Sequence, residues 1–78
     1  MNAQPARILT IDDEDLVREV LTAYLEDSGF EVIQAGDGRT GIELIGREQP
    51  DLVLCDLRMP GMDGLQVLAT VTRDFPEL

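Results

Sequence analysis

Short apolar runs alternate along this chain with stretches in which apolar residues recur at helical spacing. The expected strands are residues 7–11, 31–35 and 52–55, and the expected helices are residues 15–28, 39–47 and 65–73. This alternation is typical of βα units built around a parallel sheet. The sequence therefore predicts an α/β fold, and right-handed crossovers between parallel strands allow the first and third strands to be neighbours, with the second strand on the outer side.

The apolar spacing also predicts how each element packs. Apolar residues share one stripe in each expected helix: Val17, Val20, Leu21, Tyr24 and Leu25 in the first, Ile42, Leu44 and Ile45 in the second, and Leu65, Leu68 and Val71, facing inward, in the third. Gly41 and Gly46 each cost up to ~1 kcal/mol inside a helix, so we expect the second helix to be short and mobile. Asp63 is a plausible N-cap for the third helix. Residues 52–55 are apolar throughout, which predicts a strand that is covered on both faces.

Length and composition exclude several classes of protein. The chain has 78 residues, enough for one small domain, and no apolar run approaches the ~20 residues that span a bilayer. Its first residues lack the features of a secretion signal, so a cytoplasmic location is the default. The net charge of −10 argues against binding nucleic acid. No histidine is present, which removes histidine-based triads and most zinc sites, and the single cysteine, Cys55, is expected to pack as a small hydrophobe.

Three aspartates follow two of the expected strands. Asp12 and Asp13 come directly after residues 7–11, and Asp56 follows residues 52–55. Neighbouring parallel strands bring these ends into one crevice, where two carboxylates ~4 Å apart repel by ~4 kcal/mol at an effective dielectric near 20. A hard cation such as Mg²⁺ relieves this repulsion. Asp56 is the best candidate for a nucleophilic phosphoryl acceptor, and a turn at Pro60-Gly61 places the Arg58 carbonyl near the site as a further ligand.

These residues resemble the receiver domain of bacterial two-component response regulators. The resemblance rests on Asp12-Asp13, on the string from Ala35 to Gly38, and on the string DLRMPGMDG from Asp56 to Gly64, and it covers nearly all of the chain. It implies a flavodoxin-like, doubly wound parallel sheet. It also implies that a phosphoryl group passes in a Mg²⁺-dependent reaction from a histidine kinase or phosphotransfer protein to Asp56. In this comparison Asp13 is the main carboxylate ligand, Asp12 positions a metal-bound water, and Arg58 lends its backbone carbonyl.

The chain departs from that family in extent. Receiver domains have five βα units, and residues 1–78 supply three, in sheet order 2-1-3, so we expect a partial domain without units 4 and 5. The missing part carries a hydroxyl residue, a lysine and an aromatic switch residue, and no lysine is present in this chain. We therefore expect a fragment of a longer regulator whose effector domain, or separate downstream partner, lies outside the chain. The third strand is then a bare edge, which predicts possible self-association.

Two alternatives remain open at this point. The string from Asp13 to Val17 matches the D-x-D-x-V pattern of haloacid dehalogenase-like phosphatases, in which Asp13 would be the nucleophile. That pattern is short, leaves the segment from Asp56 to Gly64 unexplained, and needs a lysine that the chain lacks. The second alternative is a receiver-like module that binds partners without being phosphorylated. The expected function is regulatory rather than enzymatic.

Overall fold

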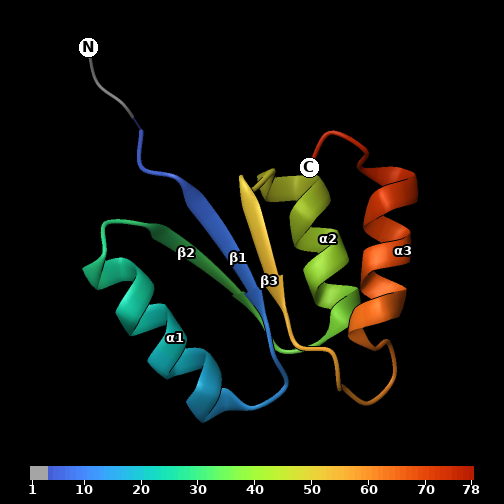
Figure 1. Ribbon diagram of the computed structural model, residues 1–78, viewed down its shortest axis with the longest axis horizontal. Coiled ribbons are helices and arrows are strands. Elements are labelled where there is room, and N and C mark those ends of the chain that lie inside the picture. The colour runs from blue at the N-terminus through green and yellow to red at the C-terminus, as the bar shows by residue number, and fades with distance from the viewer. Residues whose placement is uncertain (1–3) are drawn as a thin grey trace.

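The computed structural model describes residues 4–78 and shows three strands and three helices in alternation (Figure 1). The elements are β1 (Arg7–Ile11), α1 (Asp15–Asp27), β2 (Glu31–Ala35), α2 (Gly38–Glu48), β3 (Leu52–Cys55) and α3 (Gly64–Asp74). The strands have the predicted bounds, and every helix end lies within one residue of the prediction. Within residues 4–78, no helix is both long enough and apolar enough to span a bilayer.

The three strands form one parallel sheet in the order β2-β1-β3, which confirms the predicted fold class. Ile11, the last residue of β1, pairs with Ala35 of β2 and with Cys55 of β3. All three strands therefore end at the same level. Their carboxyl ends, and the loops that lead into the helices, lie together at the lower edge of Figure 1.

Helices cover the sheet unevenly. In Figure 1, α1 lies on one side of the strands, and α2 and α3 lie together on the other. The main core is on the side of α2 and α3, where Leu9 and Ile11 of β1 are completely or almost completely buried. Its buried members are Leu9, Ile11, Ala35, Leu44, Ile45, Met59 and Val67. Two of these members, Leu44 and Ile45, confirm the predicted inward stripe of α2.

Helix α2 forms over nearly its predicted length although it contains Gly41 and Gly46. It runs for 11 residues, and the Asp37 side chain accepts a hydrogen bond from Thr40 N at 2.8 Å as its N-cap. This bond lowers the pKa of the Asp37 carboxyl. A Cβ at Gly41 would collide with the Ile11 side chain, so glycine lets the helix lie close against β1. This contact and the N-cap offset the cost of the glycines, and the mobility predicted for this helix stays a prediction.

Several large apolar side chains remain exposed. Leu65 and Leu68 of α3 are 67 % and 61 % exposed, so the prediction that they face the core is wrong, and Val67 is buried in their place. The predicted stripe on α1 is only partly covered, and β3 is open on one face, contrary to the expectation from its composition. The exposed apolar residues of these elements are Leu16, Val17, Val20 and Tyr24 on α1 and Leu52 and Leu54 on β3.

An arginine ties together the opposite end of the sheet, where the strands begin. The Arg7 guanidinium donates to Glu48 Oε1 at 2.9 Å and to the Glu48 carbonyl, and it lies 3.6 Å from Glu31 Oε1. The Arg7 backbone N–H donates to Asp51 Oδ2 at 2.8 Å. Arg7 therefore links β1 to β2, to the end of α2 and to the residue before β3, far along each strand from the aspartates.

Candidate functional site

The three aspartates singled out in the sequence meet at the carboxyl end of the sheet. Asp12, Asp13 and Asp56 each offer a carboxylate oxygen, and these oxygens all lie within 4.8 Å of one another. Hydrogen bonds that continue the sheet place two of them: Asp12 N donates to Ala35 O at 3.1 Å, and Asp56 N donates to Ile11 O at 2.9 Å. The convergence that the sequence predicted is therefore a direct result of the strand order.

The β1–α1 loop presents two unlike carboxylates. Asp12 is half-buried, and its Oδ1 accepts a hydrogen bond from Glu14 N at 2.9 Å. Asp13 is exposed, and its carboxylate has no protein hydrogen-bond partner among residues 4–78. Asp12 is thus held by the loop, whereas Asp13 is free to bind a ligand from solvent.

Asp56 stands at the start of the loop between β3 and α3. Its Oδ1 accepts a hydrogen bond from Arg58 N at 3.2 Å, and within the described chain its Oδ2 has no protein partner. One oxygen of this half-buried carboxylate is therefore oriented by the backbone, and the other is available. This asymmetry suits a group that must both stay in place and react. The role predicted for the Arg58 carbonyl oxygen stays a prediction.

The loop after Asp56 is closely packed against the start of α3. Gly64 N donates to Leu57 O at 3.1 Å, and a Cβ at Gly64 would lie 2.6 Å from Asp56 O, a distance that only glycine avoids. Gly61 has φ 79°, as the third position of the predicted Pro60-Gly61 type II turn requires. The predicted N-cap at Asp63 is confirmed. Together these features hold the backbone that carries Asp56.

Cys55 is half-buried directly before Asp56. Its Sγ lies 3.3 Å from Asp56 O, and it packs against the core as predicted. Burial raises the pKa of the Cys55 thiol, and the negative charges of Asp56 and Asp12 raise it further. The thiol is therefore kept protonated beside the acidic cluster, and it is a poor metal ligand in this state.

The donor set fits a hard divalent cation. Mg²⁺ prefers carboxylate and carbonyl oxygens, keeps several water molecules, and is commonly held by one or two carboxylates together with phosphate oxygens. Three carboxylates within 4.8 Å, one of them exposed, provide such ligands on an open surface. The three carboxylates repel one another, and no protein group among residues 4–78 offsets the charge of the Asp13 carboxylate. The residues present therefore fit Mg²⁺.

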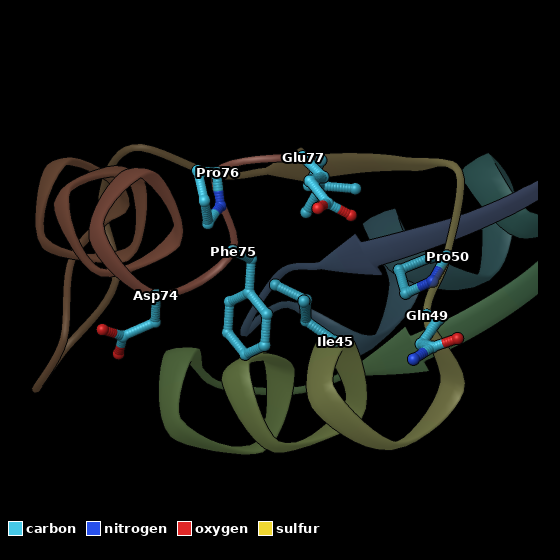
Figure 2. Close-up of a pocket in the computed structure, with 8 residues that line it drawn as sticks. Ile45, Gln49, Pro50, Asp74, Phe75, Pro76 and Glu77 are labelled. Carbon is cyan, nitrogen blue, oxygen red and sulfur yellow. The ribbon is translucent and has the colours of Figure 1, made fainter.

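A different concave surface lies at the other end of the molecule. A cavity of about 470 Å³ is formed between the end of α2 and the residues after α3, where the Phe75 ring lies beside Ile45 (Figure 2). Gln49 and Pro50 form its far wall. Its one aspartate, Asp74, pairs with Arg73 at 2.8 Å. This cavity brings together no cluster of reactive groups, so the chemistry of the chain lies at the aspartates.

The fold and the site define a class of protein: a parallel α/β domain that collects carboxylates where its strands end. The family model of the response regulator receiver domain matches residues 8–78, and the chain belongs to this family. It is therefore a receiver segment of two-component signalling. The comparisons give no support to the phosphatase alternative, and Asp15, the second aspartate of that pattern, lies outside the cluster of three.

Individual relatives agree with this assignment. Protein PilH of Pseudomonas aeruginosa is 44 % identical over 69 residues, which cover 88 % of this chain and 57 % of that protein. Transcriptional activator protein PfeR of the same organism is 44 % identical over 68 residues, which cover 87 % of this chain and 22 % of that protein. The chain thus spans little more than half of one relative and less than a quarter of the other.

Solved structures show the same fold. The chemotaxis protein CheY4 of Vibrio cholerae has a TM-score of 0.87 at 30 % identity, with 90 % of this chain and 58 % of that chain covered. The response regulator protein TrrA of Thermotoga maritima, solved in complex with Mg²⁺-BeF, has a TM-score of 0.88 at 34 % identity, with 91 % of this chain and 62 % of that chain covered. A protein of this fold and family is therefore known with magnesium bound.

Sequence reasoning missed one residue beside the site. The Arg18 side chain is only 16 % exposed, and its Nη1 donates to the Asp12 carbonyl oxygen at 2.6 Å. Its spacing from Asp15 on the same helix, at i and i+3, is a signal in the sequence, but an ion pair on a helix surface is common and uninformative. The contact with Asp12 becomes visible only when α1 is placed against the strand ends.

Proposed function

We propose that this chain accepts a phosphoryl group on Asp56 from the phosphohistidine of a histidine kinase or phosphotransfer protein, in a Mg²⁺-dependent reaction. The modified segment then acts as a regulatory switch for an effector domain or downstream protein. The observation that carries the proposal is the meeting of Asp12, Asp13 and Asp56, with carboxylate oxygens within 4.8 Å, in a chain of the receiver family.

The chemistry is a transfer between two nucleophiles. A carboxylate oxygen of Asp56 attacks phosphorus, a P–O bond forms, and the P–N bond of the phosphohistidine breaks. The electron pair of that bond returns to the imidazole nitrogen of the donor. Asp56 Oδ1 already accepts the Arg58 N–H, so Oδ2 is the oxygen available for attack. The close approach of the Gly64 backbone to Asp56 and Leu57, which leaves no room for a Cβ, supports the backbone that carries the acceptor.

Asp13, Asp56 and Asp12 are the proposed holders of Mg²⁺, with Asp12 acting through a bound water and the Arg58 carbonyl as a further ligand. Bound there, the ion would offset the negative charge of the carboxylates and of the phosphoryl oxygens. The support is the exposed Asp13 carboxylate beside Asp56, which has no protein partner among residues 4–78, together with the magnesium complex of TrrA.

The proposed role is regulatory, and the chain itself is proposed not to be an enzyme. One relative, a protein-glutamate methylesterase/protein-glutamine glutaminase of Anaeromyxobacter dehalogenans, is matched over only 21 % of its length. We also propose a cytoplasmic location and no direct contact with nucleic acid, because the net charge of −10 repels phosphate backbones. PfeR is by its name a transcriptional activator, so an output in transcription is one candidate for the longer protein.

Phosphorylation of the full chain by acetyl phosphate with Mg²⁺ tests the acceptor. Mass spectrometry is expected to map one phosphoryl group to Asp56, and Asp56→Asn is expected to abolish it. Asp27→Asn, an exposed aspartate at the end of α1, is the matched control and should leave labelling unchanged. Labelling that survives in Asp56→Asn contradicts the assignment, and labelling that maps to Asp13 supports the phosphatase alternative. Partner binding without labelling of the wild type supports the phosphorylation-independent alternative.

We further propose that this chain associates with a second copy through β3. Within residues 4–78, β3 pairs with β1 on one edge and has no partner strand on the other. Leu52 and Leu54 are 50 % and 36 % exposed there. Unpaired edges of this kind favour pairing with another chain, although the net charge opposes association at low salt.

Sedimentation equilibrium at micromolar concentration tests the association. A dimer is expected for the wild type, and Leu54→Lys is expected to weaken it by placing a charge on the edge strand. Leu16→Lys is the matched control, because Leu16 is 72 % exposed but lies on α1, which packs against β1 and β2. A stable, folded monomer in the wild type refutes this proposal without affecting the assignment of Asp56.

A further inference from the structure

Arg18 connects two of the three loops around the acidic cluster. Its Nη1 donates to the Asp12 carbonyl oxygen at 2.6 Å, and its Nη2 donates to Asp15 Oδ1 at 2.7 Å. On the other side, a Cβ placed on Gly36 would lie 3.5 Å from Nη1, an ordinary contact distance. The guanidinium therefore lies between the β1–α1 loop and the residue that follows β2, and the Arg18 side chain as a whole is only 16 % exposed.

The bond to the Asp12 carbonyl has a geometric consequence for Asp13. The Asp12 carbonyl, the Asp13 nitrogen and the Asp13 Cα belong to one planar peptide unit. Holding the carbonyl oxygen therefore sets the direction in which Asp13 leaves the loop. The Asp13 carboxylate has no protein hydrogen bond of its own among residues 4–78, so this peptide plane is its nearest polar restraint.

Three polar groups of Asp12 make hydrogen bonds, and Arg18 is the donor in the third of these bonds. Its N–H donates to Ala35 O at 3.1 Å, its Oδ1 accepts from Glu14 N at 2.9 Å, and its carbonyl accepts from Arg18. The first two bonds come from the sheet and from the loop itself. Only the third ties the loop to a side chain of α1, so its removal leaves the Asp12-Asp13 peptide free to rotate.

We propose that Arg18 is a positioning residue of the cation site, which holds the Asp12-Asp13 peptide so that both carboxylates face Asp56. The inference rests on the proposed function, because it requires Mg²⁺ to bind at these carboxylates. Charge and position act in opposite directions here. The positive charge of Arg18 repels a divalent cation, whereas its bond to the Asp12 carbonyl organises the ligands.

Because the two effects change the affinity for Mg²⁺ in opposite directions, the direction of the change in Kd on removing Arg18 shows which effect is larger. Isothermal titration of the full chain with Mg²⁺ measures the Kd of the wild type and of Arg18→Met, which keeps the length of the side chain and removes its charge and its donors. If Arg18 positions the ligands, the Kd rises by about tenfold, the usual effect of removing a group that orients metal ligands. Arg18→Lys, which keeps the charge but has one donor nitrogen in place of the two that Arg18 uses, is expected to recover part of the affinity.

Arg7→Met is the matched control. Arg7 also binds a main-chain carbonyl and a carboxylate, but it does so at the other end of the strands, so its loss is expected to lower the melting temperature and to leave the Kd unchanged. A Kd in Arg18→Met that equals or falls below that of the wild type overturns the proposal. If Arg18→Met does not fold, Arg18→Gln decides by the same criterion. A wild-type chain that does not bind Mg²⁺ overturns the proposed function and this inference together.

Discussion

Neutralising Asp56 is expected to stabilise the metal-free protein. Asp56→Asn removes one of the three charges in the cluster but keeps an oxygen that can accept the Arg58 N–H. Asp56 is the informative position because it meets Asp12 and Asp13 only when the chain folds. Asp12 and Asp13 are neighbours in the sequence, so much of their mutual repulsion is already present in the unfolded state.

The distances set the size of the effect. At the 4.8 Å limit of the cluster, each pair of charges repels by about 0.9 kcal/mol in the dielectric of bulk water and by about 3.5 kcal/mol at a dielectric near 20. Asp56 takes part in two such pairs, and all three carboxylates are at least partly exposed to solvent, so we take the lower limit and expect the free energy of unfolding to rise by about 1 to 2 kcal/mol. For a domain of this size, 1 kcal/mol corresponds to a shift of about 4 to 8 °C in Tm.

Thermal unfolding followed by circular dichroism, in EDTA at low ionic strength, measures this gain. Glu43→Gln is the matched control, because it makes the same change in net charge at an exposed position of α2. Added Mg²⁺ should make the wild type melt above Asp56→Asn. At 100 times its Kd, a bound ion stabilises the folded state by about 2.7 kcal/mol, and the variant has lost one of the carboxylates proposed to hold the ion. At 1 M salt the Debye length falls to about 3 Å, so the gain in EDTA should shrink.

Either of two results refutes this reasoning. An Asp56→Asn variant that melts at or below the wild-type temperature in EDTA shows that the three carboxylates do not repel one another as their distances require. A gain in Glu43→Gln as large as that in Asp56→Asn assigns the effect to net charge instead of to the cluster.

Three further predictions follow from single contacts. Gly64→Ala should destabilise the fold by about 1 to 3 kcal/mol in urea titration, because its Cβ must push against the backbone at Asp56; unchanged stability contradicts this packing. Asp63→Ala should cost about 1 kcal/mol in the same assay by removing the capping box with Gln66, and Asp63→Asn should recover most of it. The raised pKa of Cys55 means that the folded state holds its proton more tightly than the unfolded state. Stability should therefore fall as pH rises above the ordinary thiol value of 9.0, an effect that Cys55→Ala removes.

Much of this molecule was predictable because its signals are local. The strands 7–11, 31–35 and 52–55 are bounded by charged residues, Gly and Pro, and Asp63 marks the start of α3. The convergence of Asp12, Asp13 and Asp56 was also expected from the sequence, because right-handed crossovers allow the first and third strands to be neighbours and the family resemblance implies the order 2-1-3.

Other features depend on contacts between distant parts of the chain. Several residues have the spacing of core residues but stay exposed: Val17, Val20 and Tyr24 of α1, and Leu65 and Leu68 of α3. Apolar residues are buried only where another element covers them, and no element within residues 4–78 covers these five. Gly41 seemed to weaken α2 until its contact with Ile11 was known. Propensity scales cannot anticipate such a contact, because they describe a helix by itself.

The sequence by itself determined the order of the elements, the parallel sheet and the identity of the three acidic residues, because periodicity and strand chirality act along the chain. Only the tertiary structure decided which carboxylate is held and which is free, and which arginines support the two ends of the sheet. Nothing in the sequence distinguishes the roles of Arg7 and Arg18, but in the structure Arg7 binds Glu48 and Arg18 binds the Asp12 carbonyl. Hydrogen bonds depend on distance and direction in space, and packing of α1 and α2 against the strands sets both.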